Sequence, residues 1–257
     1  MDPEALLPPL RLLAFESIDS TNEELRRRAA QAAPEGTAAV AETQTSGRGR
    51  QGRRWDSPRG NLHCSLLLRP GCSAAAAANL SFAAALAVAD AIEPLLPTAS
   101  RLAFKWPNDV LLGGRKVAGI LLETEIKGET VDWVVLGVGV NVVAFPQQAM
   151  YPATSLAAAG CDRADAREVM ESYFDHIRIW YARWRNEGFA PLRAAWLARA
   201  GGRGETVEVQ MGNERLVGRF TDLDADGALI LELSGGLRRI TAGDVFLTAA
   251  PAGREEV

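Results

Sequence analysis

Residues 105–119 read Lys-Trp-Pro-Asn-Asp-Val-Leu-Leu-Gly-Gly-Arg-Lys-Val-Ala-Gly and decide how the middle of the chain folds. Two apolar stretches, 110–112 and 116–125, lie on either side of Gly113 and Gly114. Glycine takes positive φ without steric cost, so this pattern predicts a tight hairpin between two antiparallel strands. A further strand is predicted at 102–106, which makes this region one of strands and tight turns.

Outward from this hairpin, strands alternate irregularly with helices. Ser20 and Thr21 each have a glutamate three positions later, a capping-box arrangement that predicts a helix start near residue 22. Residues 131–143 are the most apolar stretch and predict a strand buried on both faces. The other expected strands are 10–17, 37–43 and 62–68, and the expected helices are 22–33, 75–96, 165–186 and 190–199. Because strands and helices do not alternate regularly, we predict an α+β fold with a mixed β-sheet.

The last fifty or so residues form a separate pattern of short strands. Gly201-Gly202-Arg203-Gly204 is the best candidate for a linker. Beyond it, the turns at Asp226-Gly227 and Gly235-Gly236 are typical of hairpins and predict a small antiparallel β-barrel. We therefore expect a catalytic domain at 1–200 and a small domain at 204–250.

The composition narrows the class of protein. The 257 residues are 47% hydrophobic, which is typical of a globular protein. The formal net charge of −4 disfavours general nucleic-acid binding. No apolar run approaches the roughly 20 residues of a membrane helix, and the acidic N-terminus is unlike a secretion signal. Three cysteines at no paired spacing favour free thiols in a reducing compartment. We expect a cytoplasmic protein without membrane contact.

Lysine is scarce in this chain. Only Lys105, Lys116 and Lys127 among the 28 basic residues are lysine. Where arginine is the default cation, a retained lysine indicates that a compact ammonium group was needed. Lys127 lies in a predicted solvated turn. Lys116 follows Asp109 across the glycine hairpin, so folding the hairpin back brings it near Lys105.

The loop at 47–54 has the composition of an anion-binding segment. Its three glycines allow close approach of backbone to a ligand, and Arg48, Arg50 and Arg53 supply donors that fit carboxylates and phosphates. It lacks the Gly-Lys-Ser/Thr ending of a Walker loop, and a strand follows it where a dinucleotide fingerprint has a helix. The alternatives are a solvated basic loop and an arginine–glycine segment that contacts RNA.

Two further segments place polar groups at strand ends. Lys105, Asn108 and Asp109 combine a cation with oxygen ligands, as a nucleotide with Mg²⁺ requires, although an Asn-Asp pair also forms simple turns. The segment 137–141 has two glycines that leave room for something flat and an amide at Asn141. The same glycines equally suit a packed neighbour.

In this order and spacing, the segments resemble the biotin protein ligases. The resemblance covers essentially the whole chain, including Gly243-Asp244-Val245 in the small barrel, and rests most on 47–50, 105–109 and 116–119. It implies the biotin/lipoate ligase catalytic fold, which is like that of class II synthetases, followed by an SH3-like barrel.

The resemblance implies a two-step reaction. Biotin and ATP with Mg²⁺ give biotinyl-5′-AMP and pyrophosphate, and the biotinyl group then passes to one lysine of a biotin carboxyl carrier protein domain. Lys116, Arg50 and Asp109 match catalytic positions, and Asn108 and Asp109 are expected to hold Mg²⁺. The positions implied for biotin are Ser20, Thr21, Asn22, Gln44, Arg48, Gly49, Arg50, Lys116 and Gly119. Those implied for the nucleotide are Arg48, Arg50, Arg53, Trp55, Lys105, Asn108, Lys116 and Asn141.

The chain departs from the family in three places. About ten residues precede the first predicted strand, so we expect neither the helix-turn-helix domain of some members nor DNA binding. Gln51 stands where an arginine often extends the basic loop. Residues 144–155 contain no tryptophan, which some members place over the adenine. A homodimer is plausible from the resemblance.

Two rival functions belong to proteins of the same predicted fold, and a third belongs to a different class of protein. A lipoate ligase would share the ATP chemistry and differ in its acid. An octanoyltransferase would need a nucleophilic cysteine near a lysine, a setting that Cys64, Cys72 and Cys161 do not show in the sequence. A non-enzymatic RNA-binding module would use the arginine–glycine loop and the small barrel, against the acidic net charge.

Overall fold

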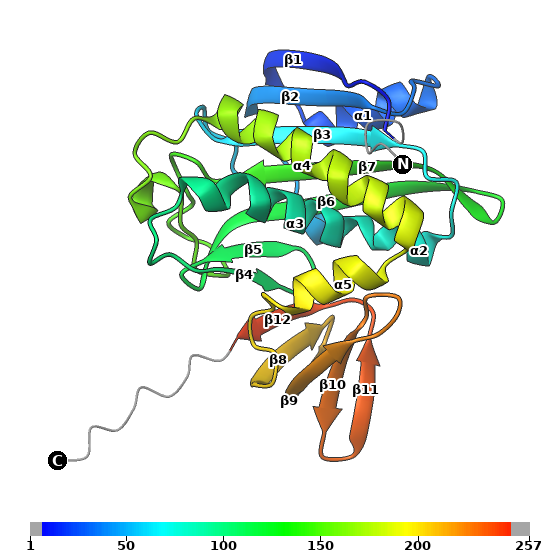
Figure 1. Cartoon of the computed structure of the whole chain (residues 1–257), viewed down its shortest axis with the longest axis vertical. Coiled ribbons are helices and arrows are strands. Elements are labelled where there is room, and N and C mark those ends of the chain that lie inside the picture. The colour runs from blue at the N-terminus through cyan, green and yellow to red at the C-terminus, as the bar shows by residue number, and fades with distance from the viewer. Residues whose placement is uncertain (1–6, 248–257) are drawn as a thin grey trace.

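The computed structural model describes residues 7–247 and contains two β-sheets (Figure 1). The larger sheet has the strand order β1-β2-β3-β7-β6-β5-β4. Its strands are β1 (Arg11–Ile18), β2 (Thr37–Gln44), β3 (Leu62–Leu68), β4 (Leu102–Lys105), β5 (Asp109–Leu112), β6 (Arg115–Lys127) and β7 (Thr130–Val140). β1 and β2 run parallel, and every other neighbouring pair is antiparallel. The predicted mixed sheet is confirmed.

The predicted glycine hairpin joins β5 to β6. Gly113 and Gly114 have φ of 57° and 75°, the left-handed region that L-residues with a side chain rarely adopt. β7 lies between β3 and β6 and is buried along nearly its whole length, as its apolar sequence predicts. The hairpin fixes which residues of β4, β5 and β6 lie beside one another.

One helix covers one face of the larger sheet at its parallel end. A parallel pair needs a crossover connection, and α1 (Thr21–Ala30) supplies it between β1 and β2. Leu25 and Ala29 of this helix pack with Trp133 and Val135 in a small separate core. The helix ends three residues earlier than predicted because Ala32 takes a left-handed φ of 58°. Its N-terminus places residues 20–22 beside the sheet.

The opposite face carries α3 (Leu80–Ile92) and α4 (Ala166–Glu187), which pack on each other (Figure 1). The stretch predicted as one helix over 75–96 is divided at Asn79, which keeps helical φ and ψ, into α2 (Ala74–Ala78) and α3, and Pro94 lies in a short 3₁₀ turn after Ile92. By length and composition Ala74–Leu95 could cross a membrane, contrary to the sequence expectation. In this fold 72% of an apolar 18-residue segment within Ala74–Leu95 is buried, as in the core helix of a globular protein.

The smaller sheet is antiparallel throughout, with the order β11-β10-β9-β8-β12. Its strands are β8 (Thr206–Met211), β9 (Glu214–Leu223), β10 (Leu229–Leu233), β11 (Gly236–Ile240) and β12 (Asp244–Leu247). This agrees with the small barrel predicted after residue 204, of which residues 248–250 lie outside the described chain.

The two sheets are docked through α5 (Ala190–Leu197) and the end of β4. Trp196 of α5 packs between Phe82 and Phe104, with ring centroids 5.4 and 5.7 Å away. The Trp106 Nε1 donates to the Gly227 carbonyl oxygen at 3.0 Å. Figure 1 shows β12 on the side of the small sheet that faces the large one. The docking therefore brings the start of β12 to the edge of the larger sheet.

Candidate functional site

A cavity of about 430 Å³ lies where the larger sheet, the 47–54 loop and the start of β12 meet. All of the site residues predicted from the sequence line it. They are Ser20, Thr21, Asn22, Gln44, Arg48, Gly49, Arg50, Arg53, Trp55, Lys105, Asn108, Asp109, Lys116, Gly119 and Asn141. Residues 244–246 and 148–151 complete the wall. The fold thus brings together segments that are far apart along the chain.

Three charged side chains form the centre of the site. The Asp109 carboxylate lies 2.7 Å from the Lys105 Nζ through one oxygen and 2.6 Å from the Lys116 Nζ through the other. The side chains of Lys105 and Asp109 are 7% and 8% exposed, whereas that of Lys116 is 25% exposed. β-pairing sets this geometry, since Lys105 lies opposite Asp109 and Lys116 opposite Leu111. The sequence prediction that the hairpin brings Lys116 near Lys105 is confirmed.

The two lysines keep the buried Asp109 ionised. Burial by itself raises the pKa of Asp109, but the ammonium groups of Lys116 and Lys105 together outweigh it and hold that pKa below its ordinary value. A carboxyl with a lowered pKa is a weak proton acceptor. Asp109 is therefore better suited to orienting the two lysines than to taking a proton.

Asn108 and Asp109 do not fit a protein-held magnesium site. Both Asp109 oxygens already face an ammonium group, which repels a divalent cation. The Asn108 Nδ2 donates to the Ile120 carbonyl oxygen at 2.5 Å, and its Oδ1 accepts from the Arg50 Nη1 at 3.3 Å. Among residues 7–247, no group of three His, Cys, Asp or Glu side chains is placed to hold a metal ion. These contacts do not favour the predicted role of the two side chains as metal ligands.

The glycines on the cavity floor make room for protein side chains. A Cβ on Gly139 would lie 2.4 Å from the Trp55 ring, and one on Gly137 would lie 2.0 Å from the Asn22 Oδ1. Gly119 has the Trp55 ring and the Lys116 side chain 3.0 Å from the same position. Of the two interpretations of the 137–141 segment, the packed neighbour is the one that the structure shows. The indole of Trp55 also lies 5.3 Å from the Lys116 Nζ, as a cation–π contact.

Polar contacts at the N-terminus of α1 hold Asn22 in place. The Asn22 Nδ2 donates to the Glu123 Oε2 at 2.8 Å, and its Oδ1 accepts from the Ser65 hydroxyl at 2.6 Å. Thr21 is held in turn, because its backbone N–H donates to the Gln44 Oε1 at 2.8 Å. Thr21 and Asn22 thus belong to a polar wall whose hydrogen-bonding groups are held in place by the protein.

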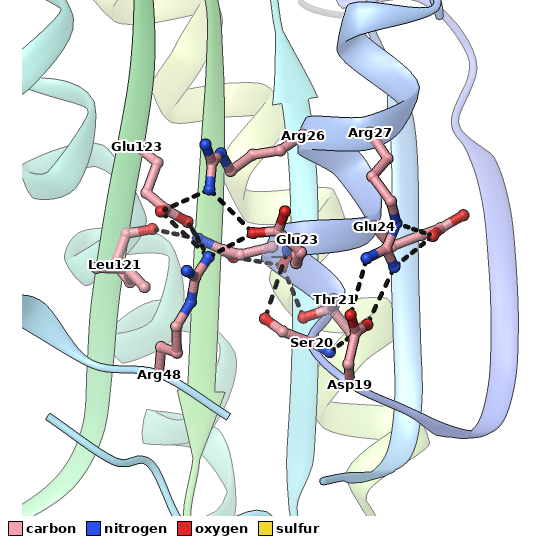
Figure 2. A network of polar contacts seen from close by, with 12 residues as sticks. Asp19, Ser20, Thr21, Glu23, Glu24, Arg26, Arg27, Arg48, Leu121 and Glu123 are labelled. Carbon is pink, nitrogen blue, oxygen red and sulfur yellow. Dashed lines mark hydrogen bonds and ion pairs between the residues drawn. The ribbon is translucent and has the colours of Figure 1, made fainter. Parts of the chain in front are cut away.

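Glu123 joins that wall to the arginine–glycine loop (Figure 2). The Arg48 guanidinium reaches Glu23 at 2.9 Å and Glu123 at 3.3 Å, and Figure 2 shows it pointing between these two carboxylates. Arg26 lies on the other side of the same pair, 2.9 Å from Glu23. The sequence reasoning missed Glu123. Its place four residues after Gly119 on the same strand was the available signal.

Two other arginines of the loop, Arg50 and Arg53, face the small domain. The Arg50 Nη1 donates to the Gly243 carbonyl oxygen at 3.2 Å, and Arg53 pairs with the Asp244 carboxylate at 2.5 Å. Burial lowers the pKa of Arg50, and the Asp244 carboxylate partly offsets this, so the guanidinium stays charged at neutral pH. The start of β12 is therefore part of the site, a contribution for which the sequence offered only the Gly-Asp-Val motif.

The loop that follows β7 is held by Asn141 and contributes Tyr151 to the cavity wall. The Asn141 Nδ2 donates to the Thr154 carbonyl oxygen at 3.0 Å, so this amide fixes the loop that follows β7. In that loop Tyr151 lies over the Lys105 ammonium group, 4.7 Å from ring centroid to Nζ. The sequence reasoning looked for a tryptophan in residues 144–155 and passed over this tyrosine, which lines the cavity.

The cysteines are unsuited to nucleophilic catalysis. Burial raises the pKa of Cys64, which lines the cavity floor, and it also raises those of Cys72 and Cys161. All three are free thiols. Because the thiolate is the nucleophile, a raised pKa argues against a cysteine-dependent acyl transferase.

Comparisons with known proteins agree on the kind of chain this is. A model described as the biotin/lipoate A/B protein ligase family matches residues 14–141, and one described as the biotin protein ligase C-terminal domain matches residues 203–248. A solved structure of the biotin protein ligase from Aquifex aeolicus, in complex with biotin and ATP, has a TM-score of 0.78 at 28% identity. The match covers 93% of this chain and 99% of that one. Fold and cavity thus define a ligase of the biotin/lipoate class.

Sequence relatives make the assignment more specific. The biotin–[acetyl-CoA-carboxylase] ligase of Paracoccus denitrificans is 43% identical over 236 residues, which are 89% of this chain and 97% of that protein. The enzyme of the same name from Mycobacterium tuberculosis is 37% identical, over 88% of this chain and 85% of its own. The chain belongs to the biotin protein ligase family.

We expect Asp109→Asn to lower the free energy of unfolding by about 3–5 kcal/mol at neutral pH, because it leaves two ammonium groups without their buried counter-charge. A carboxyl whose pKa is lowered by folding contributes stability above its ordinary value of 3.8 and loses it as the pH falls through the lower folded pKa. The difference between parent and variant should therefore shrink in acid. Urea unfolding across the acid range measures it.

The exposed Asp175→Asn on α4 is the control, and it should change stability by less than about 0.5 kcal/mol. A difference between Asp109→Asn and the parent that is the same at neutral and acid pH would contradict the assignment of Asp109 as an ionised partner of the lysines.

Proposed function

We propose that this protein joins biotin to ATP, holds the resulting biotinyl-5′-AMP, and passes the biotinyl group to a lysine of a biotin carboxyl carrier protein domain. The observation that carries the proposal is the Lys105–Asp109–Lys116 cluster in one cavity with the arginine–glycine loop. The family membership and the Aquifex aeolicus structure with biotin and ATP support it.

The first step needs cations more than it needs a base. An ionised carboxylate is already the nucleophile at neutral pH. Its oxygen attacks the α-phosphorus of ATP, the bond from that phosphorus to the bridging oxygen breaks, and pyrophosphate leaves. Both reactants are anionic, so Lys116 and Arg50 offset their repulsion and stabilise charge on the transferring phosphorus. The exposure of Lys116 relative to Lys105 favours Lys116 for this contact.

In the second step an amine attacks the activated carbonyl. The nitrogen–carbon bond forms, the bond from carbonyl carbon to phosphate oxygen breaks, AMP leaves, and the amine releases a proton. The acceptor lysine must approach as a free amine. Asp109 contributes by holding Lys116 beside the leaving phosphate. Closure of the arginine–glycine loop keeps water from hydrolysing the mixed anhydride.

The wall residues divide by the part of the ligand they face. We assign biotin to the polar wall and the floor beside it. The residues on that side are Ser20, Thr21, Asn22, Gln44, Arg48, Gly49 and Gly119. We assign the nucleotide to the side formed by Arg53, Trp55, Lys105, Asn108 and Asn141, where Tyr151 supplies the aromatic face that a tryptophan supplies in some members.

Mg²⁺ enters the site together with ATP, as part of the substrate. Because Asn108 and Asp109 do not fit a metal site, we infer that Mg²⁺ is held by the phosphate oxygens. The acceptor is inferred from the named acetyl-CoA-carboxylase ligases among the relatives. A reducing cytoplasmic setting suits three free cysteines. The homodimer stays a prediction.

A lipoate ligase and an RNA-binding module are the remaining alternatives. Lipoate would use the same phosphate chemistry, so only the choice of acid separates the two ligases. RNA binding is disfavoured because Arg48 and Arg53 are engaged by carboxylates within the protein. Salt-dependent binding of RNA would revive it.

Pyrophosphate release from ATP and Mg²⁺, with biotin, lipoate and octanoate compared in parallel, tests the function. We expect release with biotin alone. Lys116→Ala should lower its rate by about 10²–10³-fold, because it removes a cation at the transferring phosphorus. Lys127→Ala, at the exposed end of β6 beside the turn to β7, is the matched control and should leave the rate unchanged. Release with lipoate would overturn the choice of biotin as the acid. If none of the three acids supports release, the assignment of the protein as an enzyme is overturned.

Glu123 offers a second test that concerns biotin more than ATP. Glu123→Gln removes the charge that anchors both Asn22 and Arg48, and hydrogen bonds to a charged group contribute about 1.5–3 kcal/mol. We expect the KM for biotin to rise about tenfold or more, with the KM for ATP nearly unchanged. Glu125→Gln, on the exposed end of the same strand, is the control. Equal rises for both substrates would contradict the assigned role.

A further inference from the structure

The arginine–glycine loop has carboxylate partners on two sides. Arg48 reaches Glu23 and Glu123 on the larger sheet's side, whereas Arg50 and Arg53 turn toward the small domain. Inside the loop, a few backbone hydrogen bonds give it shape, such as Gly49 N–H to the Arg53 carbonyl oxygen at 2.6 Å. Its attachment to the rest of the protein therefore depends largely on side-chain charges.

On the small-domain side, those charges converge on Asp244, the first residue of β12. The Asp244 Oδ2 lies 2.5 Å from the Arg53 Nη2, and its Oδ1 lies 3.6 Å from the Arg50 Nη1. The Asp244 side chain is 18% exposed, so water screens these contacts only in part. The neighbouring Gly243 carbonyl oxygen accepts from Arg50 as well.

Asp244 also offsets a repulsion within the loop. Arg50 and Arg53 are close enough that the charge of Arg53 disfavours that of Arg50. A shared carboxylate between two guanidinium groups removes this repulsion and favours the geometry in which both lie at the cavity edge.

We propose that Asp244 is a positioning residue through which the small C-terminal domain holds the arginine–glycine loop over the cavity. The inference rests on the proposed function, in that the loop is the part of the site that retains biotinyl-5′-AMP. It gives the small domain a defined task in retaining the intermediate between the two half-reactions. Asp244 touches neither reactant in this assignment and acts through Arg50 and Arg53.

Tryptic cleavage after Arg54 reports loop opening without any ligand. The Arg54 side chain is 83% exposed, and cleavage there requires the loop to unfold locally. We expect Asp244→Asn to speed this cleavage about tenfold, as loss of a charged hydrogen bond implies. Asp244→Glu should restore slow cleavage. Glu214→Gln removes a surface ion pair with Arg238 in the same domain and should leave cleavage unchanged.

Arg53→Gln removes the same ion pair from the loop side and keeps Arg54 as the cleavage site. We expect Arg53→Gln to speed cleavage, and the double variant with Asp244→Asn to add less than the sum of the two single effects on the logarithm of the rate. Strict additivity, or cleavage of Asp244→Asn at the parent rate, would overturn the proposal. This variant also serves if Asp244→Asn fails to fold.

The second readout is the rate at which preformed biotinyl-5′-AMP escapes from the protein. Asp244→Asn should release it about tenfold faster while its pyrophosphate burst with biotin persists. If Asp244→Asn is cleaved faster but the parent protein forms no adenylate, the role of Asp244 in holding the loop is supported and the proposed function is overturned. Adenylate formed and released at the parent rate would overturn the link between Asp244 and retention.

Discussion

One buried carboxylate makes the rest of the cavity possible. Asp109 lies between two ammonium groups, each within 2.7 Å of one of its oxygens. Removing a cation from water costs several kcal/mol, so two neighbouring lysines would be expelled or neutralised without this partner. With it, the strand ends can present Lys116 to a ligand while Lys105 stays buried. A tight hairpin and the register of β4, β5 and β6 fix the distances, so the charge cluster depends directly on backbone pairing.

The same principle governs the side of the site formed by the arginine–glycine loop. Two anionic reactants require several cations, yet cations gathered in one place repel one another. The protein resolves this by pairing Arg48, Arg50 and Arg53 with carboxylates of its own. Glu23 and Glu123 take Arg48, and Asp244 takes Arg50 and Arg53. The guanidinium groups are then held at the edge of the cavity, and three separate parts of the fold contribute to one loop.

Residues that decide local structure were predictable, and residues that meet across the fold were not. Gly113 and Gly114 predict the hairpin, and the hairpin predicts that Lys116 returns toward Lys105, because all of this happens within fifteen residues. Asp244 meets Arg53 across 191 residues, and Asn22 meets Glu123 across 101. Sequence periodicity carries no information on such pairs. The family resemblance supplied the wall residues themselves.

Two questions that the residue types left open have a common physical origin. The 137–141 glycines were open to either a flat ligand or a packed neighbour, and only the fold shows that Trp55 and Asn22 fill the space. Likewise Asn108 and Asp109 have the oxygen atoms of a metal site, but the lysines that occupy Asp109 become visible only once three strands are paired. In both cases the residue types were informative, and the identity of the neighbour depended on tertiary packing.

The most direct test of the central claim is native mass spectrometry of the protein mixed with biotin, ATP and Mg²⁺ in the absence of any acceptor. The expected result is a noncovalent complex whose added mass is that of one biotinyl-5′-AMP. When lipoate replaces biotin, no complex with the corresponding lipoyl adenylate is expected. A protein that gains no mass with biotin, or that gains an adenylate only with lipoate, would contradict the claim that this cavity activates biotin.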